Sequence, residues 1–275
     1  MFRIKRPIAA LFLVFCIAGC ATQSFFLEKN NGFVKNLIRG RNFTLLSYIT
    51  INRRGEPLVI YIEGDGLAWE SRSRPSSDPT PTDPLVMRLA SLDPSPNVAY
   101  LARPGQYASL GASQCDAKYW TAKRFSPEVI KDMDLAVSRL RDMAGARSVS
   151  LIGYSGGGAA AVLVAARRDD VISIRTIAGN LDWSAVSNWN KVSPLNGSLN
   201  PIDYAAKIRA IPQRHFIASG DRTIPASVAK SFAGKTGDDE HESITVVKGT
   251  THHSGWENKW RKLLDMPLSP IPKNP

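Results

Sequence analysis

The chain has 275 residues, of which 43% are hydrophobic and 21% charged, and this fits one large domain or two small ones built around a hydrophobic core. The composition excludes a chain that is disordered throughout, and three Cys are too few for a small fold held together by disulfides. The net charge of +11 raises the question of a nucleic-acid partner, which the N-terminal sequence answers differently.

The N-terminus has the pattern of a secretory signal. Arg3, Lys5 and Arg6 precede an uncharged, largely apolar run, and this run is shorter than the about 20 residues that a bilayer-spanning helix needs. Residues 17–20, Ile-Ala-Gly-Cys, resemble the bacterial lipobox, which implies cleavage before Cys20 and acylation of its thiol. The alternatives are an ordinary signal peptide and an uncleaved anchor.

These features predict a lipoprotein of the bacterial cell envelope. Residues 1–19 would be the signal peptide and residues 20–40 a lipidated tether, with a membrane as partner and no nucleic acid. Ala21, rather than Asp, after the lipidated residue favours the outer membrane, facing the periplasm. Cys115 would remain as an unpaired thiol, because Cys16 leaves with the signal.

Short apolar segments alternate with helical patterns along the rest of the chain. Residues 43–51 and 57–62, joined by a turn at 52–55, predict an N-terminal hairpin. Helical spacing follows over 85–92 and 127–144, and small residues predict a buried helix over 159–166. The remaining strands are expected at 98–101, 149–152, 172–177, 215–218 and 244–247.

Strands that alternate with helices predict a mostly parallel sheet flanked by helices, the α/β class. We expect one domain over residues 41–267, followed by a Pro-rich tail at 268–275. The segment 180–212 has room for a small cap at most.

The motif Gly153-Tyr-Ser155-Gly-Gly157 lies between a predicted strand and a helix of small residues. This is the context of a nucleophile elbow, in which a strained turn exposes the serine and the glycines let strand and helix approach closely. A structural turn is the alternative. A nucleophilic Ser155 requires a histidine base and an acid further along the chain.

Among four histidines, His252 and His253 follow the last predicted strand directly, whereas His215 lies inside a strand and His241 in a polar run. The spacing Gly249-Thr-Thr-His252 favours His252 as the base and leaves His253 as the alternative. For the acid, Asp221 follows the penultimate strand in a Gly-Asp pair, and Asp182 is the rival.

The oxyanion that forms during attack on a carbonyl needs backbone N–H donors. Gly156, directly after the nucleophile, supplies one of them. We expect the other from the loop Glu63-Gly-Asp65-Gly66, with Asp65 preferred to Gly66.

Hairpin, glycine-containing loop, elbow, acid and histidine occur in the order that resembles the α/β-hydrolase fold family of serine hydrolases. The resemblance implies a Ser155-Asp221-His252 triad, an acyl-enzyme mechanism and a carboxylic-ester substrate, small or lipid-like, with no cofactor and no metal. Thioesterase and peptidase subtypes remain open. The alternative of another class is a non-catalytic protein that keeps the fold as an envelope binding or assembly module.

Overall fold

The structure, a computed structural model, describes residues 32–268, and its centre is an eight-stranded sheet with the order β1-β2-β4-β3-β5-β6-β7-β8. From β4 to β8 neighbouring strands pair in parallel, whereas β2 pairs antiparallel with β1 and with β4. The predicted mostly parallel sheet is confirmed. The strands are β1 (Val34–Arg39), β2 (Thr44–Ile51), β3 (Leu58–Ile62), β4 (Asn97–Leu101), β5 (Val149–Tyr154), β6 (Val171–Ile177), β7 (Gln213–Ala218) and β8 (Ile244–Val247).

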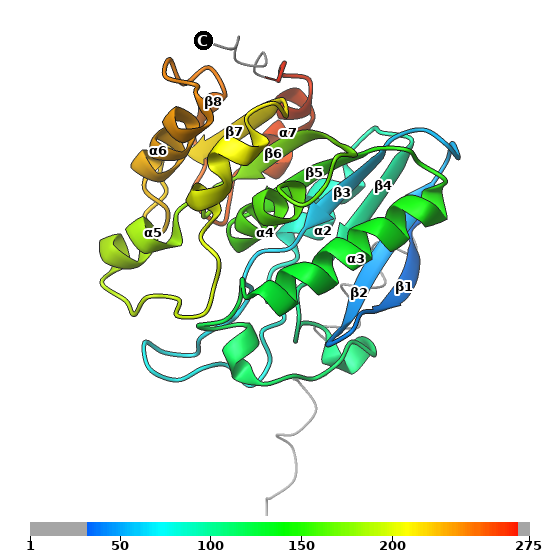
Figure 1. Ribbon diagram of the computed structural model, residues 1–275, viewed down its shortest axis with the longest axis horizontal. Coiled ribbons are helices and arrows are strands. Elements are labelled where there is room, and N and C mark those ends of the chain that lie inside the picture. Colours follow the sequence, from blue (N-terminus) through cyan, green and yellow to red (C-terminus); the bar gives the residue numbers. More distant parts are fainter. Residues whose placement is uncertain (1–31, 269–275) are drawn as a thin grey trace, which may run out of the picture.

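Helices cover both faces of the sheet (Figure 1). One core cluster packs α3, α4 and α6 against the sheet, and the other packs α2 and α7 against it. The helices are α2 (Leu85–Ser91), α3 (Pro127–Ala144), α4 (Gly156–Ala165), α5 (Trp183–Asn190), α6 (Ala226–Thr236) and α7 (Glu257–Leu264), with 3-10 turns at Ala108–Leu110, Ala117–Tyr119 and Pro201–Ile208. The segment 180–212 thus holds only α5 and one 3-10 helix.

Local sequence explains two of the helices that pack on one face of the sheet. Helix α3 begins with Pro127 at its first position and ends before Gly145, whose φ of 64° is the left-handed conformation that closes a helix. Every residue of α4 is buried, which its composition of Gly, Ala, Val and Leu permits. Because its side chains are short, α4 can pack closely against the central strands.

The predicted hairpin is wrong in its pairing. Residues 43–51 pair with β1 and β4 rather than with 57–62, and β3 lies between β4 and β5. Strand β1 falls within the range 20–40, for which the sequence predicts a tether, so the sheet begins earlier than expected, at Val34. Buried Asp132 of α3 fixes the β1–β2 turn by accepting backbone N–H bonds from Asn42 and Phe43 at 2.6 and 2.8 Å, a contact that no local pattern indicates.

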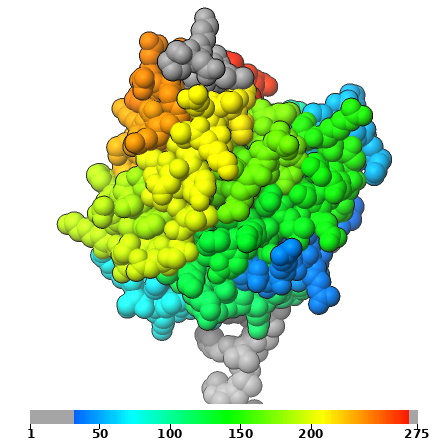
Figure 2. Space-filling model, viewed as in Figure 1, coloured from blue at the N-terminus to red at the C-terminus, as the bar shows by residue number. Residues whose placement is uncertain are grey.

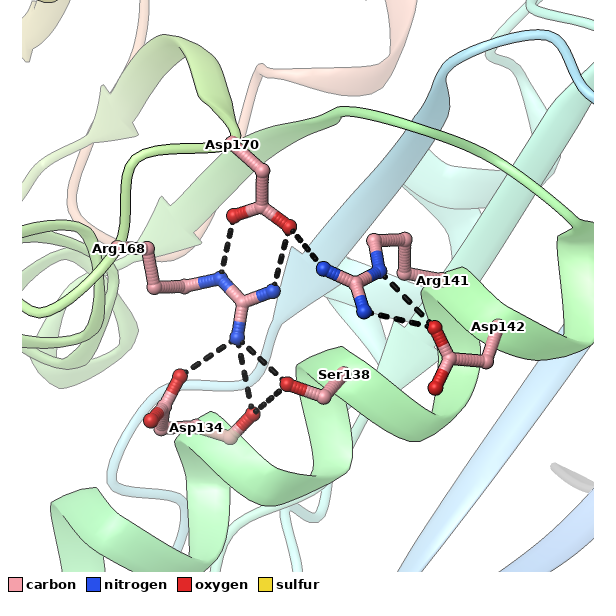
Figure 3. A network of polar contacts seen from close by, with 6 residues as sticks. All are labelled: Asp134, Ser138, Arg141, Asp142, Arg168 and Asp170. Atoms are coloured by element: carbon pink, nitrogen blue, oxygen red, sulfur yellow. Dashed lines mark hydrogen bonds and ion pairs between the residues drawn. The ribbon is translucent and has the colours of Figure 1, made fainter.

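A network of ion pairs joins α3 to the turn between α4 and β6 (Figure 3). Arg168 donates to both carboxylate oxygens of Asp170, at 2.8 and 2.6 Å, and to Asp134 of α3 at 2.6 Å. Arg141 of α3 contacts Asp170 at 2.7 Å. The Arg168 side chain is 6% exposed, so its removal would leave two partly buried carboxylates without their main partner. The network therefore fixes α3 to the loop that leads into β6.

The lipidation site predicted at Cys20, the predicted signal peptide and nearly all of the predicted Pro-rich tail lie outside the described residues. Within residues 32–268, no helix is long and apolar enough to cross a membrane.

Candidate active site

Ser155 lies at the turn between β5 and α4, the position that the sequence predicts for a nucleophile elbow. Its φ of 51° and ψ of −119° are unfavourable for a residue with a side chain. Backbone hydrogen bonds hold it there: the Ser155 N–H donates to Ile177 at 2.9 Å, and its carbonyl accepts from Gly158 and Asn180 at 3.0 and 2.9 Å. Strand β6, the loop after it and the first turn of α4 thus hold the strained turn.

The two flanking glycines are required sterically. A Cβ at position 153 would lie 2.2 Å from the Gly157 carbonyl oxygen, and a Cβ at position 157 would lie 2.2 Å from the carbonyl oxygen of Ile62 in β3. These distances are far below van der Waals contact, so no side chain fits at either position. Strand and helix therefore pack as closely at Gly153 and Gly157 as the sequence motif predicts.

The structure brings His252 and Asp221 to Ser155. His252 Nε2 lies 3.0 Å from Ser155 Oγ, and His252 Nδ1 lies 2.8 Å from Asp221 Oδ2. The three residues come from the carboxyl ends of β5, β7 and β8, which meet at one edge of a parallel sheet. A base, its orienting acid and a hydroxyl are therefore connected in one chain of hydrogen bonds.

Asp221 is held as a carboxylate. Burial raises its pKa, but the hydrogen bond with His252 and the backbone N–H groups of Ile224 and Thr223 outweigh burial, so the pKa lies below its ordinary value. Those two N–H groups donate to Oδ1 at 2.9 and 2.8 Å, which leaves Oδ2 for the histidine ring. The arrangement selects the tautomer of His252 that carries its proton on Nδ1 and presents Nε2 as an acceptor to Ser155.

The two alternative residues have other contacts. His253 Nδ1 lies 2.9 Å from the Tyr154 hydroxyl, which donates to the His252 carbonyl at 3.0 Å. His253 therefore supports the loop that carries His252, and its ring bonds to Tyr154 rather than to Ser155. Asp182 is the N-cap of α5, where its carboxylate accepts from Ser184 and Ala185. These contacts favour His252 and Asp221 over their rivals.

A cavity of about 460 Å³ opens beside Ser155 and His252. The loop after β3, residues 63–69, forms much of its wall, and Thr82 to Leu85, Arg124, Tyr154, Thr223 and His253 complete it. This size accommodates a small acyl group or leaving group. The wall carries three carboxylates, those of Glu63, Asp65 and Asp83, which makes it more polar than a purely aliphatic acyl pocket.

The predicted oxyanion donors lie on adjoining segments. Gly156 is the first residue of α4, so its N–H has no carbonyl partner within the helix. The Asp65 carboxylate packs over Gly156: a Cβ on that glycine would lie 2.1 Å from Asp65 Oδ1. Arg124 pairs with Asp65 at 2.5 Å, and buried Arg103 approaches it at 3.5 Å. Two guanidinium groups therefore compensate a carboxylate that would otherwise repel an oxyanion here.

Glu63 is a buried acid at the pocket wall. The sequence pattern places it in the loop after the early strand but predicts no role for it. It accepts from the Gly64 N–H at 2.8 Å and from the Tyr100 hydroxyl at 2.8 Å. Burial raises its pKa from 4.5 to about 7, although both hydrogen bonds act in the opposite direction. A charged residue directly after the apolar strand 58–62 is the sequence signal that could have identified it. Glu63 therefore orients the loop that carries Asp65.

Arg103 and Arg124 were also missed, because nothing local in the sequence connects them to Asp65. His215, by contrast, is structural as expected: it is buried beside Thr176, and burial lowers its pKa to about 4. No group of three or more His, Cys, Asp or Glu that could hold a metal occurs within residues 32–268.

No protein-family model and no curated protein sequence matches the chain. Solved structures do. An esterase from Pyrococcus furiosus is 13% identical with a TM-score of 0.60 over 84% of this chain and 88% of its own. An alpha-beta serine hydrolase homologue from Coxiella burnetii is 16% identical with a TM-score of 0.53 over 84% of this chain and 93% of its own.

An acylaminoacyl peptidase from Pyrococcus horikoshii is similar over part of its length: it is 13% identical with a TM-score of 0.61, over 87% of this chain and 42% of its own. At these identities the similarity concerns the fold. The chain has the α/β-hydrolase fold, as its sheet order and flanking helices indicate independently.

The raised pKa of Glu63 predicts a pH dependence of stability. Because the folded state holds this proton more tightly than the unfolded state, the contribution of Glu63 to folding is largest below about pH 4.5 and falls by about 3 kcal/mol as the pH rises through 7. Glu63→Gln keeps an acceptor for Gly64 but cannot ionise. We expect this variant to match the wild type near pH 5 and to exceed it in free energy of unfolding at pH 8, measured by urea titration.

Glu56→Gln changes an exposed carboxyl in the turn before β3 and is the matched control. It should keep the wild-type slope between pH 5 and pH 8. A Glu63→Gln variant with that same slope would contradict the pKa of about 7.

Proposed function

We propose that this protein is a serine hydrolase that cleaves a carboxylic ester through Ser155, His252 and Asp221. The observation that carries the proposal is the hydrogen-bonded chain from Ser155 Oγ through the His252 ring to Asp221, at a strained turn that opens into a cavity. The similar esterase, serine hydrolase homologue and peptidase structures agree with a hydrolase. The reaction steps that we propose use these contacts.

Attack begins when Ser155 Oγ approaches the substrate carbonyl carbon and its proton passes to His252 Nε2. The imidazolium that forms is stabilised by the carboxylate of Asp221, which is 2.8 Å from Nδ1. Negative charge then develops on the former carbonyl oxygen. The Gly156 N–H, with the Asp65 N–H as second donor, would stabilise it, and each such donor contributes on the order of 3 kcal/mol where tested.

His252 next gives the proton to the leaving alkoxide, the bond from carbon to the leaving oxygen breaks, and an acyl group remains on Ser155. Water, deprotonated by the same Nε2, attacks the acyl carbon and releases the acid, which restores the serine hydroxyl. An ester fits this sequence because its alkoxide leaves with one proton transfer. Thioesters and activated amides could follow the same route, so the bond type is a matter for substrate comparison.

The direct test is labelling by a fluorophosphonate probe together with hydrolysis of p-nitrophenyl esters of short and long chains. We expect Ser155→Ala to abolish labelling and to reduce kcat by at least about 10³-fold, because it removes the hydroxyl that contacts His252 Nε2. Ser184→Ala, an exposed serine at the start of α5, should leave both unchanged. Absence of labelling in folded wild-type protein would favour the non-catalytic binding module instead.

A second test separates the adjacent histidines. His252→Ala removes the ring that contacts Ser155 and should lower kcat by at least about 10³-fold. His253→Ala removes the bond to Tyr154 and an edge-on contact with the His252 ring, and it should cost less than about tenfold, since its effect passes through the position of His252. The base assignment is wrong if His253→Ala, and not His252→Ala, eliminates turnover.

We further propose that the protein is a lipoprotein tethered to the envelope through Cys20, in the outer membrane and facing the periplasm. Support comes from the sequence alone: a basic start, an apolar run and the lipobox-like residues 17–20. Several acyl chains on one N-terminus give stable anchoring, because each buried CH₂ contributes about 0.8 kcal/mol.

Cysteine replacement tests the tether. In a bacterial host that acylates lipoproteins, Cys20→Ser should abolish incorporation of radiolabelled palmitate and shift the protein out of the membrane fraction. The matched control is Cys16→Ser, four positions earlier in the same apolar run, which should be labelled like the wild type. Equal labelling of both variants would refute lipidation at Cys20.

A further inference from the structure

Two tryptophans are exposed beside the mouth of the catalytic cavity. Trp69 is 40% exposed and Trp189 is 59% exposed, whereas Trp120, Trp256 and Trp260 are at most 9% exposed. Trp183, the sixth tryptophan, is partly buried against the core. Single exposed apolar side chains are common, whereas a contiguous exposed apolar patch marks an interaction site, so the question is whether the two rings share one surface.

The two rings belong to one continuous surface, although they lie far apart in the sequence. Arg72, three residues after Trp69, donates to the Lys191 carbonyl at 3.3 Å, two residues after Trp189. The Trp189 indole donates to the Arg222 carbonyl at 3.4 Å. The loop after β3 (cyan) and the segment after α5 (yellow-green) lie at the same corner of the molecule (Figures 1 and 2).

This surface adjoins the cavity. Trp69 lines the cavity itself, and so does Thr223, whose carbonyl accepts from Asn190 at 2.9 Å. We call the surface the mouth rim and define it by its exposed aromatic, aliphatic and basic side chains: Trp69, Arg72, Trp189, Lys191, Val192 and Arg222.

The rim is positively charged. Arg72, Lys191 and Arg222 are exposed, and within the described part of the chain no carboxylate forms an ion pair with any of them. The neighbouring pair of Arg74 and Glu70, 2.7 Å apart, is neutral as a unit. Three uncompensated cations therefore surround two exposed indoles and Val192.

We propose that the mouth rim docks on an anionic lipid surface and turns the catalytic cavity toward the membrane. Indole rings favour the boundary between headgroups and acyl chains, while Lys and Arg side chains extend to the anionic headgroups beside them. An aliphatic residue among them adds apolar area. This combination of residues matches a lipid interface better than a protein partner, for which uncompensated cations would need acidic residues opposite each of them.

The proposed anchor at Cys20 would hold the domain near the same lipid surface. The chain from Cys20 to Gly32, twelve residue-to-residue steps, spans at most about 40 Å when fully extended. A domain held this close to a bilayer encounters it at high effective concentration, so weak contacts of the rim suffice for docking. Only the benefit of docking for catalysis rests on the proposed function. If the protein hydrolyses esters, substrates dissolved in the membrane would enter the cavity without crossing bulk water.

Short-range quenching of tryptophan fluorescence tests the contact. The full chain is incorporated into vesicles with dibrominated acyl chains, either anionic (phosphatidylglycerol with phosphatidylcholine) or zwitterionic (phosphatidylcholine alone). We expect quenching in anionic vesicles, and about twofold less of it in Trp189→Phe. Buried tryptophans contribute little, because bromine quenches only on near contact.

Charge reversal separates the rim from the anchor. Arg72→Glu with Arg222→Glu should reduce quenching in anionic vesicles to the zwitterionic level, whereas the matched control, Lys131→Glu with Arg139→Glu on α3, should not. The far-UV circular dichroism spectrum and the thermal unfolding midpoint should be unchanged in both double variants, which verifies that they fold whether or not the protein hydrolyses esters. Wild-type quenching that is absent, or that survives reversal at the rim, would overturn the proposal.

The two proposals fail separately. If wild-type protein hydrolyses no ester but shows the expected quenching pattern, the serine hydrolase proposal falls and the lipid-docking surface stands. If it hydrolyses soluble esters without quenching, the reverse holds.

Discussion

The site depends on one close approach, between the start of α4 and the carboxyl end of β3. Gly157 lies against the Ile62 carbonyl so closely that a Cβ would come within 2.2 Å of it. This contact positions Ser155 at a φ of 51° directly beside the loop that begins at Glu63. If a side chain separated helix from strand, Ser155 and the proposed oxyanion donors would move apart. The strain at Ser155 is therefore maintained by backbone packing that the central strands impose.

Three carboxylates near the reacting centre have different environments, and each environment fits a different task. Asp221 accepts three hydrogen bonds that keep it ionised opposite His252. Asp65 is compensated by Arg124 and Arg103, so it can lie over Gly156 without opposing negative charge on a bound oxygen. Glu63, whose pKa is raised to about 7 by burial, serves the backbone of the same loop through Gly64. Hydrogen bonding, ion pairing and desolvation thus give different properties to three side chains that all carry a carboxyl group.

Sequence patterns located the elements and residues whose cause is local. Apolar runs with cap and stop signals gave α3 and the parallel strands, and the elbow motif placed Ser155, with Asp221 and His252 following in order. The failures have non-local causes. Strand β1 has only one buried residue and depends on pairing with β2 and on Asp132 of a distant helix, so its sequence resembles a tether. Likewise the partners of Asp65, at positions 103 and 124, are brought to it only by the fold.

The residues of the site follow strands, whereas the residues of the mouth rim lie in loops, and this difference explains why the rim can differ chemically from the cavity. Ser155, Asp221 and His252 follow strands whose parallel pairing fixes their separation, so little variation is tolerated there. The rim residues belong to loops and to the end of α5, joined mainly by side-chain bonds to backbone carbonyls such as that from Arg72 to Lys191. Exposed loops can exchange charge and aromatic content without moving the sheet. A basic, aromatic surface can therefore surround a cavity lined with carboxylates, so that recognition of the surroundings is independent of the chemistry within.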